Sequence, residues 1–358
     1  MTDFDIGHYR LYNQGISHAS FTQVGQVVAH LGAVQAQDYP GALWALGLRT
    51  KEATPAIIEQ AVTDRAIIRT WPMRGTLHFV AAADARWLLK LLTPRIISSM
   101  ASRYRELELD DMVFGRSKEL FNQALQGGKQ LTRSEMLQIL AQGNIPPTGQ
   151  RGPHILGRLA QEGLICFGPY RNKQHTFVLL EEWLPSAREL DREEALAELA
   201  KRFFSGHGPA TVADLERWAG LKISEARAGL EMVKSQLQRK EVDGQTYWFP
   251  IDEPASPGKY PAVYLLPGFD EYILGYKDRS AVLEPQYLDK IVPGGNGMFM
   301  STIISDGRVV GIWKRTFKKD KVIITLDPFH TLSKAELEGV AVAADHYGRF
   351  MNMAVEVK

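Results

Sequence analysis

The most constraining feature of the sequence is a recurring pattern, in which helical segments are followed by two strand-like segments around a turn. In the second copy the helical segments are residues 111–126, the segment MLQIL and residues 152–163, and the strand-like segments are residues 164–167 and 175–180. Thr132 and Glu135 are spaced as a capping box ahead of MLQIL. Helices followed by a hairpin in this order predict a winged helix, which is a helix-turn-helix with a β-hairpin wing.

The first and third copies follow the same order without sequence identity between copies. In the first copy, helices are expected at residues 6–14, 21–31 and 55–65, and a hairpin turning at Gly75 is expected at residues 66–80. In the third copy, helices are expected from Asp191, after a capping box of Thr211 and Asp214, and from Ser224, with strands at residues 238–242 and 246–249. Asp243-Gly244 between these strands is a strong hairpin signal.

The composition changes after Pro250, where the proline-rich segment IDEPASPGKYPA predicts a linker. Strand-like segments at residues 298–305, 308–316 and 321–326, and a helix capped by Ser333 and Glu336, predict a separate β-rich module. We therefore expect an α+β fold of three tandem winged helix-turn-helix units plus a C-terminal β-barrel-like module. The expected domains are residues 1–108, which carry a QAQD motif, 109–186, 187–252 and 253–358.

Composition excludes several classes of protein. The 358 residues are 45% hydrophobic with a net charge of +1, so sizeable cores are expected and overall charge does not indicate a polyanion partner. Cys166 is the single cysteine, which excludes an internal disulfide and a cysteine zinc cluster. The N-terminus lacks a signal-peptide pattern and no apolar run approaches a membrane span, so we expect a cytoplasmic protein with no membrane partner.

The QAQD motif, Gln35-Ala36-Gln37-Asp38, places clustered polar side chains inside an otherwise apolar run. Because Tyr39 precedes a proline, a helix through Gln35 is expected to end or bend near Asp38. Side chains two residues apart point the same way only on an extended or irregular backbone, so two glutamines acting together would exclude plain helix here. The alternative is that the glutamines cap a helix end and bond to backbone.

Basic residues lie where winged helices usually contact duplex DNA. The candidate DNA-binding residues are Arg69 and Arg74 at the first hairpin, Arg151, His154 and Arg158 on the second copy's recognition helix, Lys222 and Arg227 around the third, and Lys314, Arg315, Lys318 and Lys319 in the C-terminal module. Between Arg308 and Lys321 there are six basic residues and one acidic residue, interleaved with Trp313 and Phe317. This pattern suits phosphate contacts and base stacking, and equally a solvated hairpin edge protected by lysines.

Other polar clusters have simpler interpretations. Asp270-Glu271-Tyr272 and Tyr276-Lys277-Asp278-Arg279 place opposite charges close together, and we expect these charges to neutralise each other. His78 alternates with apolar residues on a strand and is expected to be a hydrogen-bonded core residue. The sequence contains no glycine-rich phosphate loop, metal-binding helix motif or nucleophile elbow.

Several blocks of this sequence together resemble a known family. They are VQAQDYPGALWALGLR, RTWPMRGTLHFV, GPATVADLERWAGL, LLPGFDEYILGYKDR and NGMFMSTIISDGRVVGIWKR. In this order they resemble the bacterial winged-helix family of AlkZ-like DNA glycosylases. The resemblance covers nearly the whole chain and implies three tandem winged helices and a β-barrel-like module around a DNA-sized channel. It also implies excision of N-alkylated purines, including those in interstrand crosslinks.

The resemblance further implies which residues are catalytic. The family's motif is glutamine, an apolar residue and a second glutamine or an aspartate, and Gln35-Ala36-Gln37 matches its double-glutamine form. An alkylated purine is cationic and leaves readily, so the enzyme must mainly place a water and stabilise the developing sugar cation. A glutamine carbonyl can orient that water without acting as a strong base. Asp38, which follows the motif, could add negative charge or serve as a helix cap, and neither metal nor organic cofactor is needed.

Three functional hypotheses follow. The first is a monofunctional DNA glycosylase that acts on duplex DNA, with a monomer as the simpler expectation. The second is a non-catalytic DNA-binding protein or regulator, which burial of Gln35 and Gln37 against backbone partners would favour. The third is a small-molecule enzyme, which would need a closed pocket around Asp270, Tyr276 and Lys277.

Overall fold

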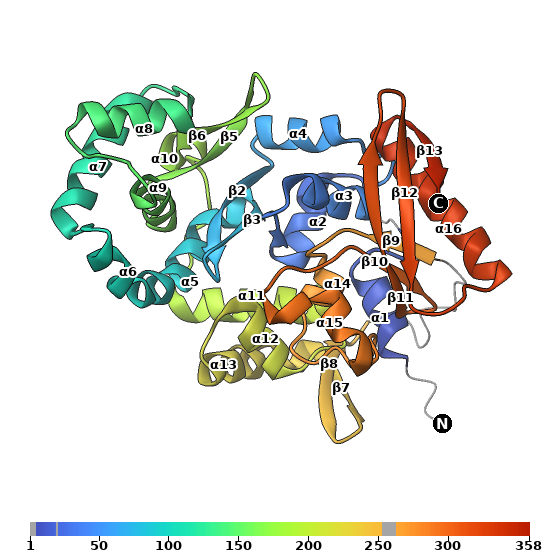
Figure 1. Cartoon of the computed structure of the whole chain (residues 1–358). Helices are drawn as coiled ribbons and strands as arrows, with labels where there is room; N and C mark the ends of the chain where they lie inside the picture. The colour runs from blue at the N-terminus through green and yellow to red at the C-terminus, as the bar shows by residue number, and fades with distance from the viewer. Residues whose placement is uncertain (1–4, 19–20, 253–262) are drawn as a thin grey trace. The chain divides into compact units, whose positions relative to one another are not determined.

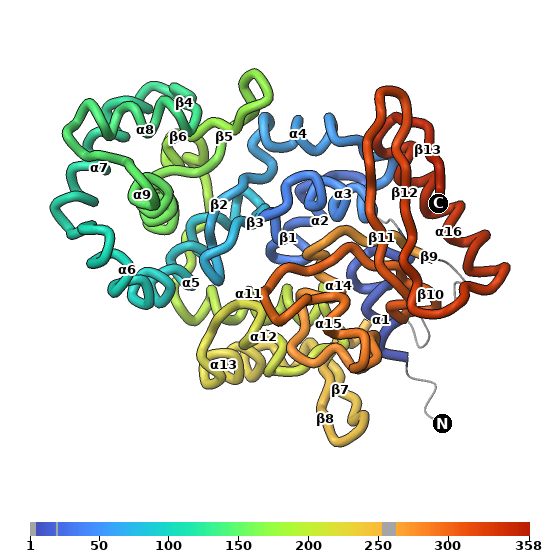
Figure 2. The backbone as a smooth tube through the Cα atoms, viewed as in Figure 1, coloured from blue at the N-terminus to red at the C-terminus, as the bar shows by residue number. Residues whose placement is uncertain are grey.

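The computed structural model describes residues 5–18, 21–252 and 263–358. The chain divides into two compact units, shown in Figures 1 and 2. The main unit comprises Met1–Ile58 and Leu196–Lys358, and the inserted unit comprises Glu59–Ala195. Two helices, α4 (Pro55–Thr63) and α11 (Arg192–His207), cross the boundaries between the units.

The inserted unit combines a sheet with helices. Its strands are β2 (Ile67–Met73), β3 (Thr76–Ala81), β4 (Leu131–Thr132), β5 (Ile165–Arg171) and β6 (Gln174–Leu179). They follow the order β3-β2-β5-β6-β4 and all pair antiparallel. Arg69 of β2 lies opposite Phe167 of β5, so the hairpins predicted for the first and second copies share one sheet. The repeat pattern alone did not predict this pairing.

The helices of the inserted unit enclose its apolar core. They are α5 (Ala85–Ser99), α6 (Ala101–Glu106), α7 (Asp111–Leu125), α8 (Arg133–Gln142), α9 (Arg151–Gln161) and α10 (Leu180–Trp183). Phe121, Met136 and Ile155 bring one face each of α7, α8 and α9 into the core. The predicted capping box at the start of α8 is present, because Thr132 and Glu135 bond to each other's backbone N–H.

The main unit begins with three helices, and three further helices lie between the insertion and the next hairpin of the chain. These are α1 (Ile6–Asn13), α2 (Val24–Leu31), α3 (Tyr39–Arg49), α11, α12 (Val212–Ala219) and α13 (Ile223–Val233). The predicted capping box of Thr211 and Asp214 starts α12. The hairpin of β7 (Leu237–Val242) and β8 (Gln245–Pro250), visible in Figure 2, turns at Asp243-Gly244 as predicted. Both turn residues have positive φ, which is the geometry that favours this dipeptide in hairpins.

The C-terminal part of the main unit is an open sheet covered by a long helix. Its strands are β9 (Val263–Leu266), β10 (Thr302–Ser305), β11 (Arg308–Phe317), β12 (Lys321–Pro328) and β13 (Ala354–Val357). Their order is β13-β12-β11-β10-β9, with a parallel pair only between β12 and β13. Helix α16 (Lys334–Met351) starts at the predicted Ser333–Glu336 box and packs on β9 and β13 (Figure 1). The sheet has two edges within the described residues, so the expected β-barrel-like module is a half-barrel sheet that does not close.

The mixed α+β character is thus confirmed, and the helices and hairpins occur in the predicted order. The winged-helix assignment of the three copies and the boundaries at residues 108, 186 and 252 stay predictions. Most of the expected linker, residues 253–262, lies outside the described residues. None of the helices in the described part of the chain combines the length and apolar character that a membrane crossing needs.

A buried ion pair ties α3 to the loop after β9. Both terminal nitrogens of Arg49 donate to the Asp270 carboxylate, each at 2.9 Å, and both side chains are 1% exposed. The other guanidinium N–H groups donate to Ala45 O, Gln14 O and Gln14 Oε1. Every Arg49 donor therefore has an acceptor, which is the condition under which a buried cation is tolerated.

Removing the anion of this pair tests how far the main unit depends on it. We expect Asp270→Ala to lower the free energy of unfolding by about 3–5 kcal/mol, because it leaves the Arg49 charge buried without a counterion. Glu231→Ala breaks the exposed Lys234–Glu231 pair of the same unit and should cost less than about 1 kcal/mol. Urea unfolding followed by tryptophan fluorescence measures both, and equal losses would contradict the assigned role.

Candidate active site

The QAQD motif lies on an extended link between two helices. Helix α2 ends at Leu31, Gly32 follows with a φ of 79°, and Val34–Gln35 forms the short strand β1. The backbone at Gln35 is extended, which is the geometry that two glutamines acting together would need. No helix runs through Gln35, so the end or bend expected of such a helix near Tyr39-Pro40 has no counterpart. These residues start α3, because proline in a first helical turn lacks only an N–H that would be unpaired there anyway.

The motif side chains differ in exposure. Gln35 is 6% exposed and Ala36 is fully buried, whereas Gln37 is exposed. The Gln35 backbone N–H donates to Glu271, so the main chain at this position faces the protein interior. One glutamine side chain of the pair is therefore accessible to a bound molecule, and the other is mostly enclosed.

Asp38 stands at the N-cap position of α3, but its side chain makes no capping hydrogen bond. Its Oδ2 lies 3.6 Å from Nη2 of Arg315, and the two side chains are 39% and 19% exposed. Gly41 leaves the space for this carboxylate, because a Cβ there would collide with Asp38 Oδ2. The helix-cap interpretation of the Asp38 side chain is thus wrong, and its charge is paired with an arginine of β11.

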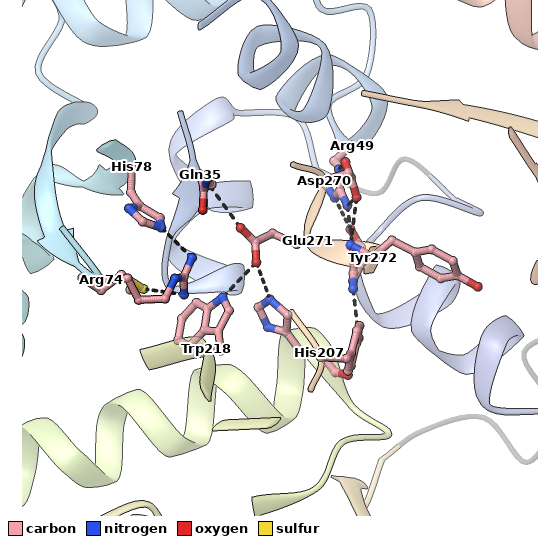
Figure 3. A network of polar contacts seen from close by, with 12 residues as sticks. Gln35, Arg49, Arg74, His78, His207, Trp218, Asp270, Glu271 and Tyr272 are labelled. Carbon is pink, nitrogen blue, oxygen red and sulfur yellow. Dashed lines mark hydrogen bonds and ion pairs between the residues drawn. The ribbon is translucent and has the colours of Figure 1, made fainter. Parts of the chain in front are cut away.

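Glu271 connects the motif to the helices α11 and α12 (Figure 3). Its Oε1 accepts the Gln35 backbone N–H at 3.1 Å, and its Oε2 accepts Trp218 Nε1–H at 2.8 Å. His207 Nε2 lies 3.2 Å from the same Oε2. His207 Nδ1 is buried without a partner, which favours the tautomer that carries hydrogen on Nε2 and donates to Glu271. Three donors thus converge on one carboxylate that is 1% exposed.

The expected mutual neutralisation within residues 270–279 is wrong. Asp270 pairs with Arg49, Glu271 faces Gln35, and Lys277 Nζ lies 3.8 Å from Glu216. Burial, reinforced by Arg217, lowers the pKa of Arg279 to about 10. Sequence reasoning therefore missed Glu271, although two adjacent acids inside the apolar segment LLPGFDEYILGY signalled buried carboxylates that need distant partners.

The inserted unit holds His78 as a bonded core residue, as expected. Its Nδ1 lies 3.0 Å from Thr76 O, and its Nε2 lies 3.1 Å from Arg74 Nη2 (Figure 3). Both nitrogens of the buried ring are occupied by protein atoms. His78 is accordingly part of the packing of the β2–β3 hairpin.

Most predicted DNA contacts of the inserted unit are engaged within the protein. Arg151 donates to Pro146 O and Leu107 O, and Arg158 pairs with Glu162 at 2.5 Å. Burial and Arg103 lower the pKa of His154, so it adds no cation at neutral pH. Arg151 and Arg158 thus form hydrogen bonds and an ion pair within the inserted unit.

The exposed predicted cations belong to the main unit. They are Lys222 and Arg227 at α13, and Lys314, Lys318 and Lys319 on β11 and the turn that follows it. Trp313 N–H still donates to Ser301 O at 3.1 Å, and after it the described strand partners of β11 come from β12, so residues 314–317 form an edge that leads to the turn. Phe317 beside this turn is half-exposed, so lysines and an aromatic ring are available together at the end of the hairpin.

The hypothesis of a small-molecule pocket around Asp270, Tyr276 and Lys277 finds no support in this geometry. Tyr276 is fully buried, donates to His207 O at 2.7 Å and accepts from Gln14 Nε2 at 3.0 Å. Asp270 is equally occupied. A groove of about 670 Å³ lies instead in the inserted unit, along α5, α9 and α10.

Comparison with known proteins identifies the family. A family model described as DNA glycosylase AlkZ-like matches residues 28–350. The chain belongs to the AlkZ-like family of DNA glycosylases. This confirms the resemblance that the sequence blocks indicated.

Two AlkZ-like relatives from Streptomyces sahachiroi match almost their full lengths. A curated relative named interstrand DNA cross-link repair glycosylase is 26% identical over 363 aligned positions, covering 95% of this chain and 94% of the relative. The solved structure of the DNA glycosylase AlkZ has a TM-score of 0.81 and 23% identity, covering 99% of this chain and 98% of that chain. At this identity the structural likeness shows a shared fold.

Arg69 is another predicted DNA contact that is buried, and it shapes the titration of a neighbouring histidine. Its guanidinium stacks over Phe167, and Nη1 lies 2.8 Å from His175 Nε2, which also receives Tyr170 OH at 2.8 Å. Burial and the Arg69 charge lower the pKa of His175 to about 4. The imidazole is therefore neutral at physiological pH and acts as the acceptor.

This lowered pKa predicts a pH dependence of stability. The unfolded chain binds a proton on His175 near its ordinary pKa of 6.5, whereas the folded chain does so near 4. The stabilisation should be complete above about pH 6.5 and fall as the pH drops toward 4. Thermal unfolding of His175→Gln should show a shallower loss over this range than the wild type. Gln123→Ala, at an exposed position of α7 with no titratable group, should retain the wild-type slope, and identical slopes for all three proteins would contradict the assignment.

Proposed function

We propose that the chain is a monofunctional DNA glycosylase that hydrolyses the N-glycosidic bond of N-alkylated, cationic purines in duplex DNA. The observation that carries the proposal is the family match over residues 28–350, which includes a QAQD motif on an extended backbone with Gln37 exposed. The family supplies the reaction class. The geometry supplies an accessible amide at the expected motif.

The proposed chemistry requires little acid catalysis. Alkylation makes the purine a cation, so the departing base is neutral and the positive charge develops on the sugar. The Gln37 carbonyl orients a water toward the anomeric carbon, and the Gln35 amide completes the polar end of the site. Asp38 is held beside Arg315, so it contributes a paired charge rather than a free base.

The proposed DNA contacts are the exposed cations of the main unit. Lys314, Lys318 and Lys319 lie near the end of the β11–β12 hairpin, Lys222 is the N-cap of α13, and Arg227 lies on α13. We propose that α13 serves as a recognition helix of a winged helix and that the hairpin follows the phosphate backbone. The curated relative's name extends the proposed substrates to interstrand crosslinks, whose unhooking breaks the same glycosidic bond.

Substitution of both motif glutamines tests the catalytic assignment. We expect Gln35→Ala/Gln37→Ala to abolish release of N7-methylguanine from duplex DNA, because the water-orienting amides are lost. Gln123→Ala/Gln126→Ala removes two exposed glutamines, one in the last turn of α7 and one at its C-cap, and should leave the rate unchanged. The measurement is base release in single-turnover reactions, with the resulting abasic sites cleaved by alkali and quantified.

The same experiment distinguishes the alternative function. If wild type and the Gln35/Gln37 double variant bind the duplex equally and neither releases base, excision of this lesion is excluded. Unhooking of duplexes with an N7–N7 guanine crosslink is then measured, to test whether the protein is a glycosylase for that substrate. Absence of unhooking there would favour a non-catalytic DNA-binding protein.

The hairpin lysines carry a prediction about affinity. If Lys318 and Lys319 each contact a phosphate, Lys318→Ala/Lys319→Ala should weaken duplex binding and reduce the slope of log K against log salt by about 1.8. Lys334→Ala, at the exposed start of α16, should leave the slope unchanged. Fluorescence anisotropy across a salt series measures both, and an unchanged slope in the double variant would show that the hairpin stays in solvent.

A further inference from the structure

Glu271 is the described side chain that fastens the backbone of the QAQD motif to a distant part of the fold. Its Oε1 accepts the Gln35 N–H at 3.1 Å, although the two residues are separated by 236 positions in the sequence. Its other oxygen is held by Trp218 Nε1–H and faces His207 Nε2. A carboxylate fixed by donors from three elements cannot move without breaking buried hydrogen bonds.

The segment around the motif has little freedom of its own. Ala33, Val34 and Ala36 are buried, and the strand β1 that carries Gln35 is only two residues long. With the Gln35 nitrogen held and its neighbours packed, the Glu271 contact contributes to the position of the exposed Gln37 side chain two residues later. This anchor is an electrostatic contact to the peptide group, so it is independent of the glutamine side chains.

Glu271 is the first residue of the short helix α14 (Glu271–Leu274), and the turn that leads into this helix has a strained backbone. Phe269 has a φ of 62°, in the left-handed region that a bulky side chain rarely adopts. It is followed by Asp270, which is held by Arg49. Such strain persists only where surrounding contacts enforce it. Here the two carboxylates that follow Phe269 bind different partners, Arg49 and the Gln35 N–H.

We infer that Glu271 is a positioning residue of the active site, whose carboxylate holds the Gln35 peptide so that Gln35 and Gln37 meet the substrate in a fixed geometry. This inference rests on the proposed glycosylase function. Glu271 does not touch the substrate. Its effect is to limit how far the two glutamine side chains can move from the positions that the reaction requires, because a misplacement of about 1 Å already slows an oriented reaction strongly.

Glu271→Gln isolates this role because it keeps the shape and changes the hydrogen bonding. A glutamine offers one acceptor oxygen and one NH₂ group, whereas the site presents donors to both oxygens. The orientation that keeps Trp218 and His207 bonded turns the NH₂ group toward the Gln35 N–H, so the anchor is released. Glu284→Gln makes the same chemical change at an exposed position of the main unit.

The expected outcome separates catalysis from binding. In single-turnover reactions on duplex DNA with N7-methylguanine, Glu271→Gln should release base about 10- to 100-fold more slowly than wild type. Its Kd for undamaged duplex should stay within about twofold, because the exposed lysines are unchanged. Hydrogen exchange of the Gln35 amide, followed by NMR, should accelerate at least about tenfold in Glu271→Gln. Glu284→Gln should match wild type in all three measurements.

Two results would overturn the inference: a Glu271→Gln rate equal to wild type, or unchanged exchange of the Gln35 amide. If wild type releases no base, the proposed function fails, and the amide exchange then decides alone whether the anchor exists. Should Glu271→Gln not fold, Glu271→Asp replaces it. The shorter side chain keeps the charge but withdraws the carboxylate by about 1.5 Å, and it should show the same slow excision and faster exchange.

Discussion

The architecture of the main unit depends on two adjacent buried carboxylates, Asp270 and Glu271. Neither could remain in an apolar interior without donors, and each draws those donors from a different part of the chain. Asp270 fixes the end of α3 through Arg49, and Glu271 fixes the start of the same region through the Gln35 peptide. Both ends of the segment from Gln35 to Arg49 are therefore bonded to the adjacent residues Asp270 and Glu271. The position of these two carboxylates thus helps to set the position of the QAQD motif.

Sequence reasoning succeeded where the signal was local. The capping boxes at Thr132, Thr211 and Ser333 started helices as predicted, and Asp243-Gly244 turned a hairpin, because each pattern acts within a few residues. It failed where the outcome depended on distant partners. The charges of residues 270–279 were expected to neutralise one another, whereas Asp270 pairs with Arg49, 221 positions away.

At the candidate site, too, local features could be predicted from the sequence and contacts with distant residues could not. The motif glutamines were found from their clustering and from the family resemblance, but nothing near them in the sequence indicated that Glu271 would support them. The basic residues could be listed from the sequence, but only the structure shows which of them are bonded within the protein and which are exposed. Arg151 and Arg158 proved to be occupied by the protein, whereas Lys318 and Lys319 are exposed. Charge counts cannot make that distinction, because it is decided by carbonyls and carboxylates that arrive from other elements.

The discontinuity of the main unit has a consequence for synthesis of the chain. Its first 58 residues leave the ribosome long before their partners, since the inserted unit occupies residues 59–195. The inserted unit is continuous, so it can complete its core while the main unit still lacks Asp270, Glu271 and the strands β9 to β13. Until residues 270 and 271 emerge, the Gln35 peptide lacks its Glu271 acceptor and Arg49 lacks the Asp270 carboxylate. A nascent chain therefore completes its candidate active site only after the whole inserted unit and residue 271 have been made, and a product truncated before residue 270 would carry the motif without either carboxylate.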